Sequence, residues 1–203
     1  MKRLNLVVLA SGRGSNFKAI QANIDAGRLS AEVKLVLSDH LDAPVLTLAN
    51  QAQVPALALA PEDYADRAGF DAALLAEICK VDCDLIVLAG YMRVLGEAFI
   101  EAAPAPIINI HPSLLPSFPG LHAQGQAVAY GVKVSGCTVH LVNHILDGGA
   151  IIAQRAVPVL PGDDEDALAT RILPVEHELY SDVIQKIAEG KIQLTGQTVT
   201  ILG

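Results

Sequence analysis

The sequence is poor in aromatic residues, in cysteine and in positive charge. It has no tryptophan, and aromatic residues make up only 4% of its 203 residues. Its three cysteines, an odd number with no secretory feature, predict free thiols rather than a disulfide framework. The sequence has 14 lysines and arginines and 22 acidic residues, which gives a net charge of -8. A general attraction to nucleic acid is therefore not expected, and an anionic ligand needs a local site.

Long apolar runs and export signals are also missing. No apolar run approaches the roughly 20 residues that a membrane-spanning helix needs. Residues 1–3 (MKR) lead directly into a strand-like run without a small-residue cleavage site, which argues against a signal peptide. We therefore expect a cytoplasmic protein that has no membrane partner. Cys79 and Cys83 could supply only two of the four ligands of structural zinc, so no metal is expected.

The first half of the chain alternates between apolar strands and helices. Hydrophobic residues make up 52% of the chain and charged residues 18%, which suits one domain over residues 1–203 with a substantial core. Strands separated by helices predict βαβ units with right-handed crossovers and a parallel sheet. Residues 1–106 are expected to form this half, with strands at 4–10, 33–37, 56–59 and 85–89 and helices between them, including one over 71–79. A helix directly after residue 93 leads to the next expected strand, at 107–110.

The pattern changes after the strand that begins at residue 107. A helix over 123–130 precedes strands at 138–142 and 150–157, which are split by the loop 143–149 and can pair antiparallel. Four acidic residues at 163–166 suit the start of a long helix that ends at Gly190, and a hairpin around Gly196 follows. We therefore expect a doubly wound, mostly parallel α/β sheet with an antiparallel C-terminal portion over 107–203.

A glycine loop, GRGSN at residues 12–16, lies between the first strand and the first helix. Backbone N–H groups and the helix dipole at this position favour an anion such as phosphate. An ordinary turn capped by Ser15 or Asn16 is an alternative. A dinucleotide site is another: Asp39 at the end of the second strand fits it, but Phe17 stands where the third glycine is needed.

The strand over 107–110 runs into Asn109, His111 and a turn bracketed by Pro112 and Pro116. Strand alternation places Asn109 and His111 on the same face, at the end of the strand where open α/β sheets bind ligands. The prolines require the strand to end in a rigid turn. A catalytic and a structural role for His111 both fit this spacing. Asp147, which precedes two glycines, could equally be a turn former.

Taken together, these motifs resemble the folate-dependent formyltransferase family, and within it the branch that formylates glycinamide ribonucleotide. The resemblance covers nearly the whole chain. It is carried by residues 12–16 (GRGSN), 88–93 (LAGYMR), 109–116 (NIHPSLLP), 118–120 (FPG) and 146–149 (LDGG). It implies formyl transfer from 10-formyltetrahydrofolate to the amine of 5-phosphoribosylglycinamide, in de novo purine biosynthesis and without a metal.

The resemblance also implies which residues form the site. Asn109, His111 and Asp147 correspond to the catalytic residues. The phosphate and ribose of the ribonucleotide would be held by Gly14, Ser15, Asn16 and Glu176. The folate would contact Arg67, Met92, Arg93, Val94, Leu95, Asn109, Asn143, His144 and Asp147. The chain departs from the usual pattern at 143–145 (NHI), where acidic residues are commoner, and at 124–125 (QG), which replaces a more polar pair.

The implied chemistry suits these residue types. An amine attacks the formyl carbon, and Asn109 and a protonated His111 would stabilise the resulting oxyanion. Asp147 would favour the charged form of His111. The proton would pass from the attacking amine to the departing nitrogen through His111 or through a water held by Asp147.

Other functions remain to be weighed against this one. A formyltetrahydrofolate hydrolase usually carries a regulatory domain, whereas we expect a single domain here. A tRNA formyltransferase needs a basic surface and an additional domain, and the negative net charge of this chain disfavours that function as well. A nucleotide-binding module without activity would not explain Asn109 and His111. The chain has neither a G-x-S-x-G elbow nor a P-loop, which disfavours a serine hydrolase and an NTPase. A monomer and a homodimer are both compatible with the sequence.

Overall fold

The computed structural model describes residues 3–202. They group into two compact units, with the boundary between Ile108 and Asn109. Unit 1 lies before this boundary and unit 2 after it. The strand β5, Ile107–His111, begins with the last residues of unit 1 and ends in unit 2.

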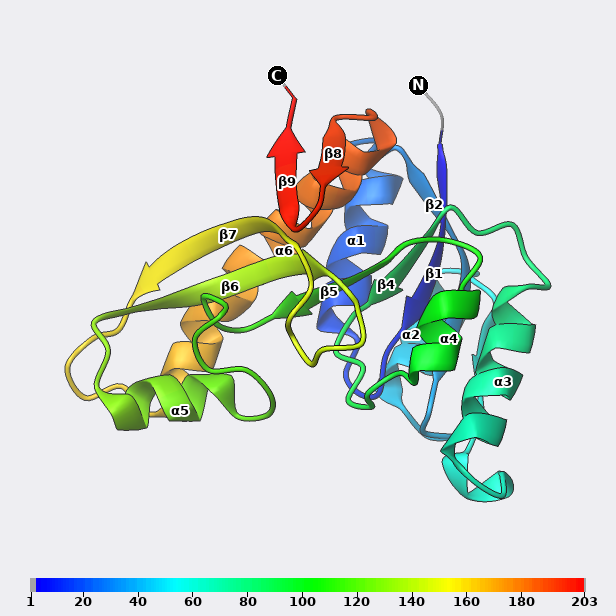
Figure 1. Cartoon of the computed structure of the whole chain (residues 1–203), viewed down its shortest axis with the longest axis horizontal. Coiled ribbons are helices and arrows are strands. Elements are labelled where there is room, and N and C mark those ends of the chain that lie inside the picture. The colour runs from blue at the N-terminus through cyan, green and yellow to red at the C-terminus, as the bar shows by residue number, and fades with distance from the viewer. Residues whose placement is uncertain (1–2, 203) are drawn as a thin grey trace. The chain divides into compact units, whose positions relative to one another are not determined.

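Unit 1 is a parallel α/β unit, as its alternating pattern predicted. Its strands pair in the order β3-β2-β1-β4, and each of these pairs is parallel (Figure 1). Its elements are β1 Leu4–Leu9, α1 Ser15–Asp25, β2 Ala31–Ser38, α2 Pro44–Gln51, β3 Ala56–Ala58, the 3-10 helix η1 Pro61–Asp63, α3 Arg67–Ile78, β4 Leu85–Leu88 and α4 Glu97–Ala102.

The central strands of unit 1 carry apolar side chains on both faces. All four residues of β4 are buried, and so are five of the six residues of β1. The loops that follow these two strands are tied together. Ser11 donates its backbone N–H to the carbonyl of Gly90 over 3.0 Å, and its hydroxyl accepts from the backbone N–H of Met92 over 2.8 Å. The loop after β1 and the loop after β4 therefore form one continuous edge.

Unit 2 is organised around an antiparallel pair and a long helix. The strands β6, Val134–Leu141, and β7, Ile151–Pro158, pair antiparallel with an irregularity between Val139 and His140. The helix α6, Glu165–Ala188, packs along both strands (Figure 1). Its apolar face is buried through Leu168, Ile172, Leu179 and Val183. The remaining elements are α5 Ala123–Tyr130 and the hairpin β8 Ile192–Thr195 with β9 Thr198–Ile201.

Some boundaries differ from those expected. The helix α3 begins at Arg67 rather than near residue 71, because the side chain of Asp66 caps it by accepting from the backbone N–H of Gly69 over 2.8 Å. The helix expected directly after residue 93 is the shorter α4, and residues 89–96 form an irregular loop. Strand β6 begins at Val134, four residues before the expected start at Thr138. Because Val134 is apolar but exposed, the apolar pattern does not indicate where the strand starts.

Two glycines allow β6, β7 and the loop between them to approach closely. A Cβ on Gly149 would overlap the carbonyl oxygen of Leu141, and one on Gly136 would overlap that of Arg155. Glycine at these two positions is therefore required by contact with a backbone rather than by a turn. Separately, within residues 3–202 no helix has the length and apolar character needed to cross a membrane.

Candidate functional site

The buried side chain of Asp147 lies between two histidines in unit 2. Its Oδ2 is 3.5 Å from Nδ1 of His111, and its Oδ1 is 3.7 Å from Nε2 of His140. The side chains of Asp147, His111 and His140 are 8%, 6% and 3% exposed, respectively. Asp147 adopts a left-handed conformation with φ of 51°, and its Oδ2 accepts from the backbone N–H of Gly120 over 2.7 Å. The predicted proximity of His111 and Asp147 is confirmed.

Both ring nitrogens of His111 face hydrogen-bond acceptors. Nδ1 faces the carboxylate of Asp147, and Nε2 lies 2.9 Å from the carbonyl oxygen of Phe118. A carbonyl oxygen can only accept, as can an ionised carboxylate. A hydrogen on Nε2 matches the carbonyl of Phe118, and a hydrogen on Nδ1 matches the carboxylate of Asp147.

The surroundings of His140, by contrast, favour its neutral form. Burial lowers its pKa, and this effect outweighs the opposing influences of the Leu141 carbonyl and of Asp147. Its Nδ1 lies 2.9 Å from the carbonyl oxygen of Leu141 and must donate to it. Nε2 then carries a lone pair and accepts from Nδ2 of Asn109 over 3.2 Å. The orientation of the Asn109 amide is thus fixed by a neutral imidazole.

Sequence reasoning missed His140. One signal was available, because Thr138 and His140 alternate on an apolar strand and so share a face. That face fixes the proline turn after β5: Oγ1 of Thr138 donates to the carbonyl of Ser113 over 2.7 Å and accepts from the N–H of Leu115 over 3.0 Å. The strand β6 therefore orients Asn109 and holds the turn that leads to Phe118.

The glycine loop of unit 1 ends at the start of α1. Gly14 is the residue before the helix, with φ of 72°, and no side chain caps this end. The N-cap position is thus occupied by Gly14 rather than by Ser15 or Asn16, and an ordinary turn stays an alternative to a phosphate site. A Cβ on Gly14 would lie 2.6 Å from Cγ2 of Val45, so the position requires glycine for space as well as for φ. The assignment of this loop to phosphate remains a prediction.

The candidate folate residues of unit 1 lie on the irregular loop 89–96 and at the start of α3. Met92 and Val94 are 60% and 52% exposed, whereas Leu95 is buried. The guanidinium of Arg93 stacks on the ring of Phe70, with 5.1 Å from its central carbon to the ring centroid. Exposed apolar side chains on a loop held at its base suit a flat, weakly polar ligand.

Arg67, the remaining folate candidate of unit 1, begins α3. Its Nε lies 3.6 Å from Oδ2 of Asp71, and the same oxygen accepts from the backbone N–H of Gly96 over 2.9 Å. Asp71 thus connects the start of α3 to the end of the loop 89–96. Arg67 and the loop are therefore held in one arrangement within unit 1.

The other predicted residues belong to unit 2. Asn143 Oδ1 accepts from the backbone N–H of Ile145 over 2.9 Å, and His144 is exposed in the same loop. Glu176 is buried on α6. The structure thus brings together Asn109, His111 and Asp147, while the glycine loop and the candidates from residue 67 to residue 95 form part of unit 1. No group of three or more histidine, cysteine, aspartate or glutamate side chains in the described part of the chain could hold a metal ion.

A half-buried histidine on α6 predicts how stability depends on pH. Burial lowers the pKa of His177 on α6, and its Nε2 has no hydrogen-bond partner within residues 3–202. Because its pKa is lower in the folded protein, the unfolded chain binds more protons as the pH falls through the ordinary histidine value of about 6.5. Protonation then favours unfolding, so this stabilising contribution is complete at higher pH and is lost toward acid.

We therefore expect the free energy of unfolding to fall between pH 7.5 and pH 5.5, and to fall less in His177→Gln. Urea denaturation at the two pH values measures this difference. His144→Gln, which changes an exposed histidine, is the matched control and should fall as much as the unmodified protein. An equal fall in His177→Gln would contradict the assignment.

Known proteins are similar to this chain in both sequence and fold. The family model described as formyl transferase matches residues 4–184. The phosphoribosylglycinamide formyltransferase of Bacillus subtilis is 41% identical over 180 residues, which cover 89% of this chain and 92% of the relative. The Escherichia coli protein of the same name is 40% identical over 191 residues, covering 94% and 90%. The trifunctional purine biosynthetic protein adenosine-3 of Drosophila melanogaster is 45% identical over 194 residues, which are 93% of this chain but only 14% of that protein.

Solved structures agree with these relatives. The crystal structure of glycinamide ribonucleotide transformylase 1 from Symbiobacterium toebii has a TM-score of 0.96 and 47% sequence identity, covering 98% of this chain and 94% of that one. The phosphoribosylglycinamide formyltransferase of Coxiella burnetii, solved in complex with CHES, has a TM-score of 0.93 and 38% identity, covering 98% and 94%. The predicted fold class, a mostly parallel α/β sheet with an antiparallel C-terminal portion, is confirmed.

Proposed function

This chain belongs to the formyl transferase family, among its phosphoribosylglycinamide formyltransferases, and we propose that it transfers the formyl group of 10-formyltetrahydrofolate to the amine of glycinamide ribonucleotide. The products are formylglycinamide ribonucleotide and tetrahydrofolate, in de novo purine biosynthesis. The observation that carries the proposal is the cluster of Asn109 with the buried side chains of His111 and Asp147, which offers hydrogen-bond donors beside a carboxylate.

Asn109 provides the first donor for the oxyanion. One hydrogen of its Nδ2 is directed to His140, and the amide is thereby held in a single orientation. The second hydrogen is then oriented toward the formyl oxygen, where negative charge develops as the amine attacks. A donor fixed before the reaction stabilises that charge without reorganising, which is the main source of rate in acyl transfer.

His111 provides the second donor and the proton transfer. As the carbon–nitrogen bond to the ribonucleotide forms, the attacking amine must lose a proton, and the departing nitrogen must gain one as its bond to carbon breaks. The imidazolium of His111, balanced by Asp147, can stabilise the oxyanion and pass a proton along this route. Its Nε2 must first leave the carbonyl of Phe118, to which it is 2.9 Å distant.

The ribonucleotide phosphate is assigned to the glycine loop. Gly14 leaves the start of α1 without a capping side chain, so N–H groups of the loop and the helix dipole can bind an anion. Ser15 and Asn16 begin the same helix. Glu176, which is buried on α6, is assigned to the ribose hydroxyls, because a carboxylate accepts hydrogen bonds from a diol.

The folate is assigned to the exposed loop residues. Met92 and Val94 offer apolar surface to a pteridine ring, and Leu95 supports the loop from the core. Arg67 and Arg93 supply positive charge in unit 1 that suits an acidic folate tail, and Asn143 and His144 supply polar contacts from unit 2. The proposed steps use only side chains of this chain and require no metal.

A direct assay tests the reaction. The purified protein should release tetrahydrofolate from 10-formyltetrahydrofolate only when glycinamide ribonucleotide is present, because the amine is the acceptor. Absorbance of the released folate and mass spectrometry of the formylated ribonucleotide measure it. Equal release without the ribonucleotide would indicate a hydrolase instead, and binding of NAD without binding of folate would favour the dinucleotide site.

We also propose that residues 1–203 act as one catalytic domain, with halves 1–106 and 107–203, in the cytoplasm. The free thiols of Cys79, Cys83 and Cys137 support a reducing compartment. The net charge of -8 supports small-molecule partners rather than nucleic acid. Sedimentation of the purified protein would distinguish a monomer from a homodimer.

A further inference from the structure

The loop over residues 118–121 contacts both members of the proposed catalytic pair, His111 and Asp147. The carbonyl oxygen of Phe118 lies 2.9 Å from Nε2 of His111. The backbone N–H of Gly120 donates to Oδ2 of Asp147 over 2.7 Å, and the same Oδ2 is 3.5 Å from Nδ1 of His111. Backbone groups of this loop thus meet the pair at both ends. Whatever holds the loop in place therefore also sets the geometry of the pair.

The backbone conformation of this loop needs support. The φ angle is 53° at Phe118, 79° at Gly120 and 56° at His122, so every second residue lies in the left-handed region. Glycine adopts that region freely, but the other two residues do so at a steric cost. Within residues 3–202, the stretch 118–121 forms no hydrogen bond between backbone groups. Side chains must therefore hold it in this conformation.

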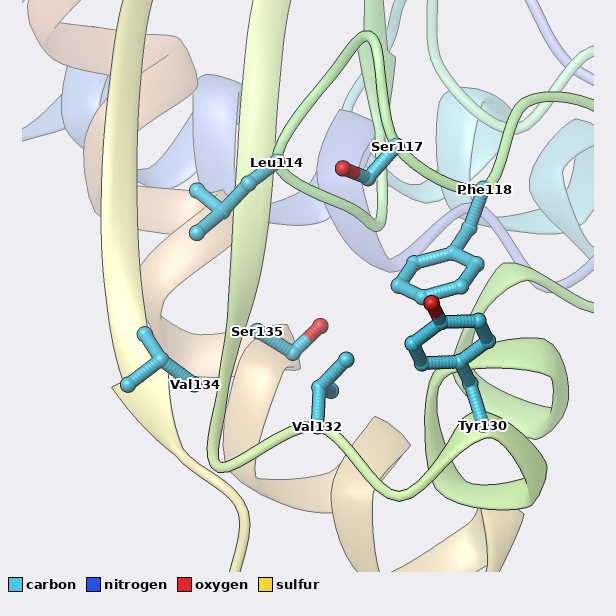
Figure 2. Close-up of a pocket in the computed structure, with 7 residues that line it drawn as sticks. All are labelled: Leu114, Ser117, Phe118, Tyr130, Val132, Val134 and Ser135. Atoms are coloured by element: carbon cyan, nitrogen blue, oxygen red, sulfur yellow. The ribbon is translucent and has the colours of Figure 1, made fainter.

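Gln126 on α5 supplies that support. Its Nε2 donates to the carbonyl of Pro119 over 3.2 Å and to the carbonyl of Leu121 over 2.8 Å. Carbonyl oxygens can only accept, so these contacts use both hydrogens of the side-chain amide and define its orientation. One helical turn later, the ring of Tyr130 meets that of Phe118 edge to face, with centroids 5.8 Å apart (Figure 2). One face of α5 therefore holds the whole stretch 118–121.

Gln126 is connected to Asp147 through a single peptide group. The carbonyl of Pro119 and the N–H of Gly120 belong to the same planar unit. Gln126 donates to the oxygen of this unit, and Asp147 accepts from its nitrogen. A planar peptide that is held at its oxygen resists turning its N–H away, and the hydrogen bond at the oxygen makes the N–H a stronger donor. A chain of contacts thus leads from Gln126 through this peptide and the carboxylate to His111.

We propose that Gln126 is a positioning residue for formyl transfer: it holds the peptide between Pro119 and Gly120, whose N–H keeps the Asp147 carboxylate aligned with His111. This role rests on the proposed function, because it acts through the proposed catalytic pair. The contacts of Gln126 are with the loop backbone, so its loss is expected to lower turnover rather than substrate affinity. Gln126 is exposed, and water competes for its donors, so its contribution is that of one net hydrogen bond.

Gln154 on β7 offers a matched control. It is also an exposed glutamine whose Nε2 donates twice, to the carbonyl of Leu115 over 2.8 Å and to Oγ1 of Thr138 over 2.9 Å. It holds the beginning of the same turn. However, the peptide that it holds joins Leu115 to Pro116, and proline has no N–H to donate. If glutamine only anchors the turn, the two residues should have equal effects, whereas the proposed role requires different ones.

Hydrogen exchange tests the contact independently of activity. In Gln126→Ala the backbone amide of Gly120 should exchange about fivefold faster, the factor that one net hydrogen bond provides, and the ring ¹⁵N resonance of His111 Nδ1 should move. Gln126→Glu keeps the length of the side chain but replaces its donors by acceptors, so it should have the same effects. In Gln154→Ala both readouts should match the unmodified protein. Unchanged exchange at Gly120 in Gln126→Ala, or equally fast exchange in Gln154→Ala, would overturn the proposal.

Steady-state kinetics tests the consequence for the reaction. Gln126→Ala should lower kcat about fivefold and leave KM for both substrates within about twofold, whereas Gln154→Ala should keep kcat within about twofold. A rise in KM at constant kcat would mean that Gln126 binds a substrate instead, and equal losses of kcat in the two variants would mean that it only anchors the turn. If exchange at Gly120 accelerates in a protein that transfers no formyl group, the proposed reaction fails while the contact with Asp147 stands.

Discussion

Asp147→Asn should lower the rate of formyl transfer about a thousandfold while both substrates still bind. Asparagine has nearly the same shape, but it removes the negative charge that lies 3.5 Å from Nδ1 of His111. Without that charge the imidazolium loses its balancing partner, and one of its two hydrogens no longer faces a carboxylate. Steady-state kinetics gives kcat, and calorimetric titration with each substrate separates binding from turnover.

A double mutant separates a cooperating pair from two independent residues. His111→Ala should also leave binding largely intact and should lower kcat by a similar amount. Because the two residues act as one unit, the double mutant should be scarcely slower than the slower single mutant. Asp166→Asn makes the same change of charge on the exposed first turn of α6 and should keep the full rate. Fully additive losses would show that Asp147 works independently of His111.

Gly14→Val should weaken binding of the ribonucleotide about a hundredfold or more, which corresponds to losing two charge-assisted hydrogen bonds. Valine is strongly disfavoured at a φ of 72°, and its Cβ would lie 2.6 Å from Cγ2 of Val45. The loop must therefore move, and the N–H groups at the start of α1 move with it. Titration with the ribonucleotide measures the loss, and the affinity for the folate should stay within about twofold.

The controls for Gly14 come from the same loop. A Cβ on Gly12 would meet nothing within 4 Å, and Gly12 does not have a positive φ, so Gly12→Ala should fold normally. If Gly14→Val does not fold, Gly14→Ala combined with Val45→Gly removes both Cγ2 and Cβ of residue 45, leaves its Cα as the nearest atom at 3.1 Å, and retains the unfavourable φ. A fall in folate affinity with unchanged ribonucleotide affinity would mean that the two ligands have been assigned the wrong way round.

Local patterns predicted much of the fold and part of the cluster. The apolar runs of β1 and β4 indicate strands buried on both faces, and the structure has them. Strand alternation placed Asn109 and His111 on one face, and the prolines after them predicted where β5 ends. These features depend on residues that are close in the sequence, where side-chain periodicity is sufficient evidence.

Contacts that depend on tertiary structure could not be predicted in this way. The partner of Asn109 is His140, 31 positions later in the sequence. The pairing of β6 with β7 is irregular between Val139 and His140. The acceptor for Nε2 of His111 is the backbone carbonyl of Phe118, which leaves no trace in residue type. Likewise, the start of α3 depends on the cap at Asp66, which an apolar periodicity does not detect.

The close approach at Gly149 limits how this chain can be redesigned. Because any side chain there would strike the carbonyl of Leu141, substitution would separate the ends of β6 and β7 and displace Asp147, two residues earlier. Ile145 and Leu146 in the same loop are exposed and can be varied. Libraries that aim at a different formyl donor should therefore randomise the tip of this loop and leave its closing glycine unchanged.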